Sequence, residues 1–197
     1  AHGGARLAFA SEPRFPSHAH AGLPIGALPF FGFAIQGDFE LVASRAALRA
    51  ASAKNIELRD DVKACFLAAV RDDDAIRAQA LAFIDGQRTD GSTAAAFWAP
   101  VVAEIRDALD AVCCVASAGG ALVRPRDTLR PPASAALQTL LPHLPVARLE
   151  AAGLYVVSSA PSSVARFGLE HVLTLCESQP DALDAIEPST HSLLFSA

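Results

Sequence analysis

From Asp38 onward, apolar residues recur at helical spacing between residues that typically begin and end helices. We expect a first helix capped by Asp38 that runs to about Ser52. The next helix shows one apolar face, formed by Leu58, Val62, Cys65, Phe66, Ala69 and Val70. Three aspartates at 72–74 predict the start of a third helix, because carboxylates are stabilised at a helix N-terminus. Gly86 is its expected end.

The longest predicted helix begins near Ser92 or Thr93 and ends at the glycine pair 119–120. Pro100 either kinks this helix or marks its first turn. Four of its apolar residues are expected to be buried together at the centre of the molecule. They are Trp98, Ile105, Leu109 and Val112.

The second half of the chain shows shorter segments. A helix is predicted between the prolines at 131–132 and Pro142, and a turn or two over 146–152. Residues 154–157 (LYVV) are the best strand candidate, and a further helix is predicted to begin at Ser162 or Ser163. A single strand makes no sheet. The pattern therefore predicts a mainly α fold, an irregular bundle of antiparallel helix pairs with an extended N-terminal arm and at most a minor β element.

Residues 1–37 differ from the rest and are predicted to form an extended arm rich in proline, glycine and phenylalanine, followed by a helical domain over 38–197. The stretch 21–36 is uncharged. As a helix it would reach only about 24 Å, short of the roughly 30 Å hydrocarbon core, and prolines and glycines interrupt it. We interpret the stretch as a docking segment that packs on another chain or on its own helices. Its expected interaction residues are Phe30, Phe31, Phe33 and Ile35.

The composition limits the partners. A net charge of −5 argues against nucleic acid, whose phosphates require a basic face. Hydrophobic residues make up 52 % and charged residues 19 %, which is more apolar than a typical domain. This excess reflects either an alanine-rich composition without functional meaning or a surface that meets another protein or a membrane.

The cysteines and the first residue suggest a compartment. Four cysteines, two of them adjacent at 113–114 within a predicted helix, favour reduced core residues over disulfides. The chain begins at Ala1 and has no methionine, which is consistent with a processed N-terminus. We expect a reducing compartment, either the mitochondrial matrix or the cytoplasm.

Motifs that carry chemistry are lacking. No phosphate-binding glycine loop, paired-cysteine metal site or nucleophile elbow is seen, so no catalytic residue, cofactor or metal is predicted. His18 and His20 share an H-x-H spacing, with His2 upstream, but lie in a proline- and glycine-rich segment, which favours a solvated turn over a metal site. His171 lies on an apolar helix face, and the adjacent Glu170 is expected to point about 100° away from it.

These observations favour a non-catalytic helical subunit or adaptor that docks on the protein chains of a larger assembly through its apolar arm. The alternative is an enzyme or small-ligand-binding protein with a site built from scattered residues. Its first candidates are His171, Glu170, Tyr155 and His143. A weaker third option is contact with a membrane surface, without spanning, through the phenylalanines of the arm.

Overall fold

The computed structural model describes residues 4–28, 30–45, 47–84, 93–157 and 164–179. His2, Gly86, Ser92, Ser162 and Ser163, which the sequence analysis singled out, lie outside these ranges. Of the described residues, 47 % are helical and 16 % lie in strands. The chain divides into two compact units, Ala1–Asp110 and Ala111–Ala197. The predicted boundary after residue 37 therefore falls inside the first unit.

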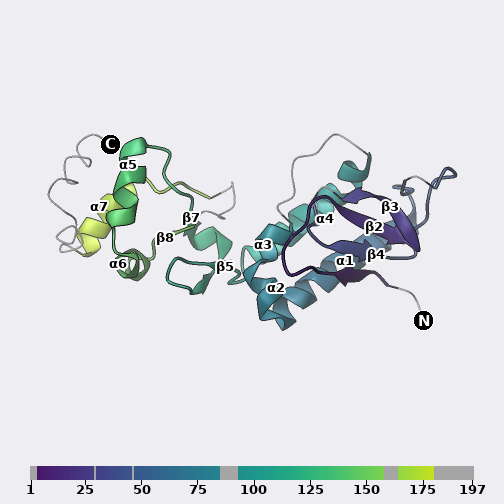
Figure 1. Cartoon of the computed structure of the whole chain (residues 1–197), viewed down its shortest axis with the longest axis horizontal. Helices are drawn as coiled ribbons and strands as arrows, with labels where there is room; N and C mark the ends of the chain where they lie inside the picture. The colour runs from purple at the N-terminus through teal and green to yellow at the C-terminus, as the bar shows by residue number, and fades with distance from the viewer. Residues whose placement is uncertain (1–3, 29, 46, 85–92, 158–163, 180–197) are drawn as a thin grey trace. The chain divides into compact units, whose positions relative to one another are not determined.

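A four-stranded mixed sheet opens the first unit (Figure 1). It consists of β1 (Arg6–Ala8), β2 (Ser17–Ala21), β3 (Leu23–Leu28) and β4 (Ala34–Gln36), in the order β1-β4-β2-β3. Strands β2 and β4 are parallel, and the other two pairs are antiparallel. Gly22 has a φ of 80°, which allows the tight turn from β2 into β3. The predicted mainly α bundle with an extended arm is therefore wrong, because the segment predicted as an arm forms a four-stranded sheet.

The physical reason for this error is the brevity and composition of the strands. The segments SHAHA and LPIGAL contain alanine, glycine and proline, which are poor strand formers on their own. These segments form strands because one face of the sheet is buried. Ser17, Ala19 and Ile35 are buried on that face, whereas His18, between Ser17 and Ala19 in β2, is exposed. That burial is a tertiary effect that local periodicity does not contain.

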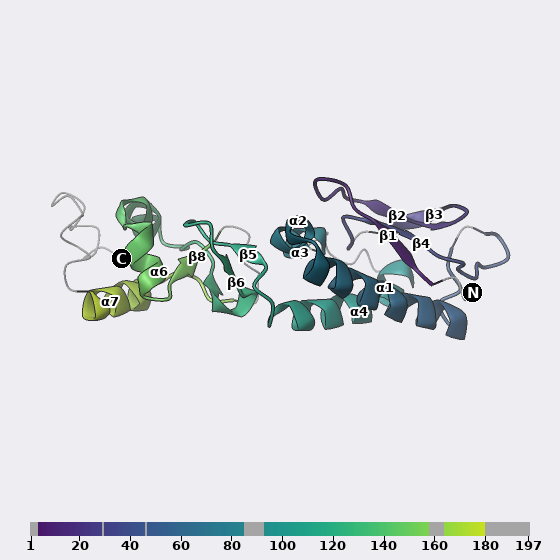
Figure 2. The same cartoon turned by 90° about the horizontal axis from the view of Figure 1, so that it is seen from below.

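Two long helices lie side by side along one face of the sheet (Figure 2). Helix α1 (Ala53–Asp72) begins at Ser52, whose hydroxyl accepts a hydrogen bond from the N–H of Asn55, and α4 (Thr93–Leu109) lies alongside it. Two short helices, α2 (Asp74–Ala78) and α3 (Ala80–Phe83), lie between them in the chain. Asp73 accepts hydrogen bonds from the N–H groups of Ala75 and Ile76, so the predicted capping role is confirmed for Asp73. Asp74 lies in the first turn of α2, whereas Asp72 is the last residue of α1.

The helix predicted over 38–52 is wrong, because this segment is a hairpin-like loop with a bridge between Leu41 and Leu48. The side chain of Asn55, fully buried on α1, holds the loop at its base. Its Oδ1 accepts from the N–H of Glu40 at 2.8 Å, and its Nδ2 donates to the carbonyls of Glu40 at 2.8 Å and Arg49 at 3.0 Å.

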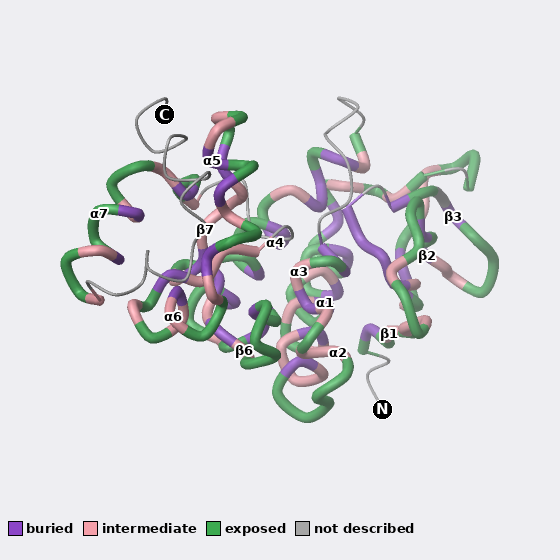
Figure 3. The backbone as a smooth tube through the Cα atoms, turned by 60° about the vertical axis from the view of Figure 1, so that its left-hand side comes forward, coloured by how far each residue is buried: buried purple, intermediate pink, exposed green. Residues whose placement is uncertain are grey.

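Aromatic rings fill the core of the first unit, where the buried positions of the sheet face those of the helices (Figure 3). Phe33 stacks on Phe66 of α1 at a centroid distance of 5.2 Å, and Phe9 meets Phe83 edge-on at the same distance. Trp98, Ile105 and Leu109 of α4 are all buried, as predicted, whereas Val112 follows the helix and is half-buried.

The second unit mixes short strands and helices. Its strands are β5 (Val115–Ala116), β6 (Leu122–Val123), β7 (Thr128–Leu129) and β8 (Tyr155–Val156), and its helices are α5 (Ala135–Leu140), α6 (Val146–Ala151) and α7 (Leu169–Ser178), with 3₁₀ turns η1 (Pro125–Asp127) and η2 (Leu141–His143). The predicted strand at 154–157 is present and pairs in parallel with β7. The long helix predicted to reach residue 119 ends at Leu109, and Cys114 directly precedes β5, so the mid-helix placement of the cysteine pair is wrong.

A separate cluster of apolar side chains forms the core of the second unit. It draws on α5, α6, α7 and the loops between them, and consists of Leu137, Leu140, Leu144, Leu149, Leu154, Phe167, Val172 and Leu175. Each unit therefore has its own hydrophobic core.

Candidate functional site

The four side chains predicted to dock on a partner are buried in the first unit. Phe31 and Ile35 are 0 % exposed, Phe33 is 1 % exposed and Phe30 is 7 % exposed. The sequence left open whether this segment packs on another chain or on its own chain. In the structure these residues pack on their own chain. They offer no free apolar surface.

The structure brings together two of the four scattered candidates. Glu170 Oε1 lies 3.2 Å from His171 Nδ1, so the expected separation of the two side chains is wrong. The same Nδ1 accepts a hydrogen bond from the backbone N–H of Gly168 at 2.9 Å. In return, the backbone N–H of His171 donates a hydrogen bond to the carbonyl of Gly168. A neutral imidazole that accepts through Nδ1 has no proton there to donate to the carboxylate. His171 thus caps α7 instead of forming a base–carboxylate dyad.

The other two candidates lie elsewhere in the second unit. His143 is exposed on η2, and Tyr155 is half-buried on β8. In the described part of this unit, no hydrogen bond or ion pair joins either side chain to His171 or Glu170. The four residues therefore do not form the scattered site that the sequence suggested.

Histidines and cysteines were the other candidates for chemistry. His18 and His20 lie on β2, not in a turn as predicted, with ring centroids 6.4 Å apart. Among the described residues, no group of three or more potential ligands could hold a metal ion. None of the four cysteines, all of which lie among the described residues, forms a disulfide, and Cys114 is 1 % exposed whereas Cys113 is exposed. Burial, together with the negative charge of Asp61, raises the pKa of the Cys65 thiol.

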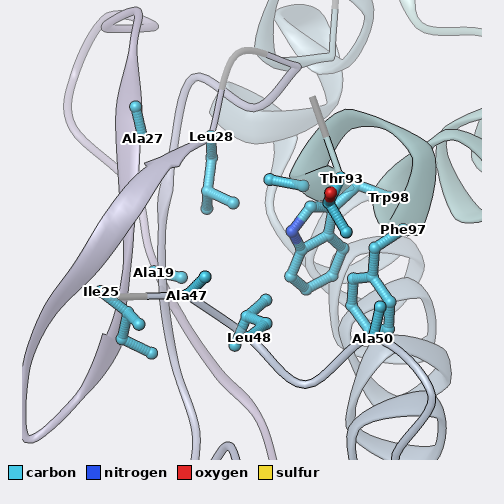
Figure 4. Close-up of a pocket in the computed structure, with 11 residues that line it drawn as sticks. Ala19, Ile25, Ala27, Leu28, Ala47, Leu48, Ala50, Thr93, Phe97 and Trp98 are labelled. Carbon is cyan, nitrogen blue, oxygen red and sulfur yellow. The ribbon is translucent and has the colours of Figure 1, made fainter. Parts of the chain in front are cut away.

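A cavity of about 120 Å³ in the first unit is a stronger candidate than any of these (Figure 4). Its described lining residues come from β2, β3, the loop before α1 and the first turns of α4. They are Ala19, Ile25, Ala27, Leu28, Ala47, Leu48, Ala50, Thr93, Ala94, Phe97 and Trp98. Five of these are alanines, whose small side chains leave the space open.

The loop wall of the cavity is fixed through Asn55. Ala47 and Leu48 belong to the hairpin-like loop that the Asn55 side chain holds at Glu40 and Arg49. The loop is also closed internally, because the N–H of Val42 donates to the carbonyl of Ala47 at 3.0 Å. This wall is therefore a hydrogen-bonded element whose geometry depends on one buried side chain.

The indole of Trp98 belongs to the wall of the cavity. Trp98 is 0 % exposed, and its Nε1 has no hydrogen-bond partner. Figure 4 shows this nitrogen on the ring edge that faces the side chains of the strands. A buried indole N–H normally finds a partner, and leaving one unmet costs about 1–3 kcal/mol.

No local pattern in the sequence predicts this site, because the residues that form it are distributed along the chain. The alanines at 19, 27, 47, 50 and 94 are unremarkable in an alanine-rich chain. Trp98 is the single tryptophan of the chain and was assigned to the core, where it does lie. Only the tertiary arrangement shows that its nitrogen is buried without a hydrogen-bond partner.

Comparison with protein-family models, with curated proteins and with solved structures finds no match to this chain. None of the helices among the described residues has the length and apolar character that crossing a membrane requires.

Proposed function

We propose that this chain is a non-catalytic binding protein whose first unit takes up a small, mainly apolar ligand. The observation that carries the proposal is the cavity between the sheet and α4, walled by apolar side chains from four parts of the chain. Pockets that bind small molecules have this character, with apolar walls and a few placed polar groups. Among the described lining residues, the polar groups are the Thr93 hydroxyl and the Trp98 indole, neither of which is a proton-transfer group near neutral pH.

The size of the cavity defines the ligand. At about 120 Å³ it is slightly smaller than the engineered 150 Å³ cavity that binds benzene, so it suits a compact group of about six non-hydrogen atoms.

The docking role predicted from the sequence stays a prediction. It cannot use Phe30, Phe31, Phe33 or Ile35 as contact residues without unfolding the first unit, because these residues form its core. The ligand-binding role is preferred because it rests on a space that the folded chain presents.

Thermal unfolding in the presence of small apolar probes tests the proposal. Cyclopentanone and methylenecyclopentane, each with six non-hydrogen atoms, are suitable probes. A ligand that binds only the folded state raises the melting temperature as its concentration exceeds its Kd. We expect at least one probe to raise the melting temperature of the full chain in a saturable way.

A matched pair of variants locates the binding site. Ala94 lines the cavity, whereas Ala96 is exposed on the same helix. We expect Ala94→Leu to abolish the probe-induced shift by filling the space and Ala96→Leu to leave it unchanged. If neither probe shifts the melting temperature of the unmodified chain, or if both variants retain the shift, the proposal is wrong.

A further inference from the structure

We propose that the second unit contains a separate binding site for a compact aliphatic ammonium ion. The site is a cavity of about 170 Å³ in this unit. Its described lining comes from the turn between β5 and β6, from η2 and α6, and from the residues in and next to β8. All of these residues belong to the second unit, so the site is independent of the ligand cavity in the first unit.

The floor of the second-unit cavity is apolar and buried. Leu144, Leu149 and Leu154 line it and are 3 %, 5 % and 8 % exposed. All three also belong to the apolar core of the unit. At about 170 Å³ the cavity is slightly larger than the engineered 150 Å³ cavity that binds benzene, so it suits a hydrocarbon body of about six to eight non-hydrogen atoms.

The rim of the second-unit cavity carries one carboxylate and one aromatic ring. Glu150 of α6 and Tyr155 of β8 both line the cavity and are both half-buried, so they remain accessible from it. Their side chains are the polar ones among the described lining residues. A carboxylate binds an ammonium ion through charge-assisted hydrogen bonds, and the face of a tyrosine ring attracts a cation.

The carboxylate of Glu150 has no cationic partner from its own unit. Residues 111–197 contain five arginines and no lysine, and all five arginines lie among the described residues. Arg124 and Arg126 pair with Asp127, and no ion pair in the described part of this unit includes Glu150. A positively charged ligand would supply the missing partner, whereas an anionic ligand would be repelled.

The position of the carboxylate is set by the turn between β5 and β6. Glu150 Oε1 accepts a hydrogen bond from the backbone N–H of Gly119 at 2.9 Å. Gly119 also leaves the space that the carboxylate occupies, because a Cβ at this position would collide with it. The matching ligand therefore places its aliphatic body on the buried leucines and its ammonium group at the rim, beside Glu150 and Tyr155.

The test compares three probes with the same ring on the full chain. Cyclohexylamine is a cation at neutral pH, cyclohexanol is its neutral analogue, and cyclohexanecarboxylate carries the opposite charge. Tyr155 is the single tyrosine of the chain, so its ring signals in a ¹H–¹³C correlation spectrum report on this cavity. We expect a Kd for the ammonium ion that is about threefold to tenfold lower than that for cyclohexanol, and we expect high salt to reduce this preference. Cyclohexanecarboxylate should leave the Tyr155 signals unchanged.

A matched pair of variants identifies the carboxylate. Glu150→Gln removes the charge but keeps an acceptor for the N–H of Gly119, so the preference for the ammonium ion over cyclohexanol should disappear while the turn stays anchored. Glu177→Gln removes the same charge from an exposed position on α7, outside the lining, and should keep the preference above about threefold. If Glu150→Gln fails to fold, the salt dependence in the unmodified chain decides, and a preference that high salt does not reduce overturns the inference.

The other outcomes are equally clear. Equal Kd values for the ammonium ion and cyclohexanol overturn the inference, as does the failure of both probes to shift the Tyr155 signals. A preference that persists in Glu150→Gln also overturns it, because the carboxylate then does not provide the selectivity. None of these results affects the proposed function, whose test is the shift in melting temperature that Ala94→Leu in the first unit abolishes.

Discussion

The indole of Trp98 packs edge-on against the ring of Phe31, with centroids 5.5 Å apart and ring planes at 89°. Phe31 lies between strands β3 and β4, and Trp98 lies in helix α4. This contact therefore connects the start of the chain to a helix that forms much later in the sequence. It places the N-terminal phenylalanines in the core that also forms one wall of the cavity.

Replacing Phe31 by alanine should destabilise the first unit by about 3–5 kcal/mol, the usual range for a buried phenylalanine. The side chain is fully buried, so its removal leaves a cavity and takes away the aromatic contact with Trp98. Urea unfolding followed by the fluorescence of the single tryptophan measures this change. The control is Leu23→Ala, since Leu23 is 76 % exposed and its loss should change stability by no more than about 0.5 kcal/mol. Similar effects of the two substitutions would contradict the packing described above.

Deleting residues 1–36 should unfold the first unit. The deletion removes all four strands and exposes the rings of Phe66 and Phe83, which pack on Phe33 and Phe9. We expect the emission of Trp98 to move to longer wavelength and the cooperative transition of the first unit to disappear. A truncated chain that keeps its blue-shifted emission would show that residues 1–36 are an accessory arm after all.

Sequence patterns predicted the helices far better than the strands. The buried residues of helix α1 recur every four residues, a spacing that is visible in the local sequence. They are Leu58, Val62, Phe66 and Val70. Strands of two to six residues contain too few positions to show a period of two, and some of their partners lie far away in the chain, as β4 does from β1 and β8 from β7. The apolar character of the stretch 21–36 was visible in the sequence, but whether it packs on another chain or on its own was not, because composition does not say what covers a residue.

The candidate site was beyond local prediction for a related reason. A cavity exists where small residues from separate elements converge, and Ala19, Ala47 and Ala94 come from a strand, a loop and a helix. The missing partner of Trp98 is likewise a property of the folded state. A histidine is a common candidate for catalysis or metal binding in a sequence, yet the side chain of His171 caps helix α7.

Asn55→Ala should release the loop between Glu40 and Arg49. Three hydrogen bonds between the Asn55 side chain and the loop backbone are lost, and partly buried backbone groups are left unmet, at a cost of about 2–3 kcal/mol. We expect trypsin to cleave faster after Arg45 and Arg49, as read by mass spectrometry. Asn55→Asp is the informative comparison, because it keeps the acceptor for the N–H of Glu40 but loses both donors. Unchanged cleavage in both variants would exclude the anchoring role.

Alkylation should distinguish the cysteines. Cys113 is exposed and should react first with iodoacetamide under native conditions, while Cys114, 1 % exposed, should be protected until the chain unfolds. Cys65 should react slowly at pH 8, because burial raises the pKa of its thiol and so lowers the thiolate fraction at that pH. Mass spectrometry with and without denaturant gives the order. Equal rates at Cys113 and Cys114 in the native protein would contradict the described burial.

His171→Ala should lower the stability of the second unit by about 1 kcal/mol, within the 0.5–2 kcal/mol range of helix caps. The substitution removes the acceptor that the N–H of Gly168 meets at the start of α7, and it removes the ring stacked on Phe167 at 5.6 Å. The control is Leu173→Ala on the same helix, where the side chain is 55 % exposed and the change should stay within about 0.5 kcal/mol.

His171→Gln separates capping from proton-transfer chemistry. A glutamine at this position can reach back to the same N–H, as in a capping box, but it cannot act as a base. We therefore expect glutamine to restore at least half of the stability lost in the alanine variant, measured by urea unfolding followed by circular dichroism. A glutamine variant as unstable as the alanine variant would show that the stacked ring on Phe167, and not the cap, is what His171 contributes.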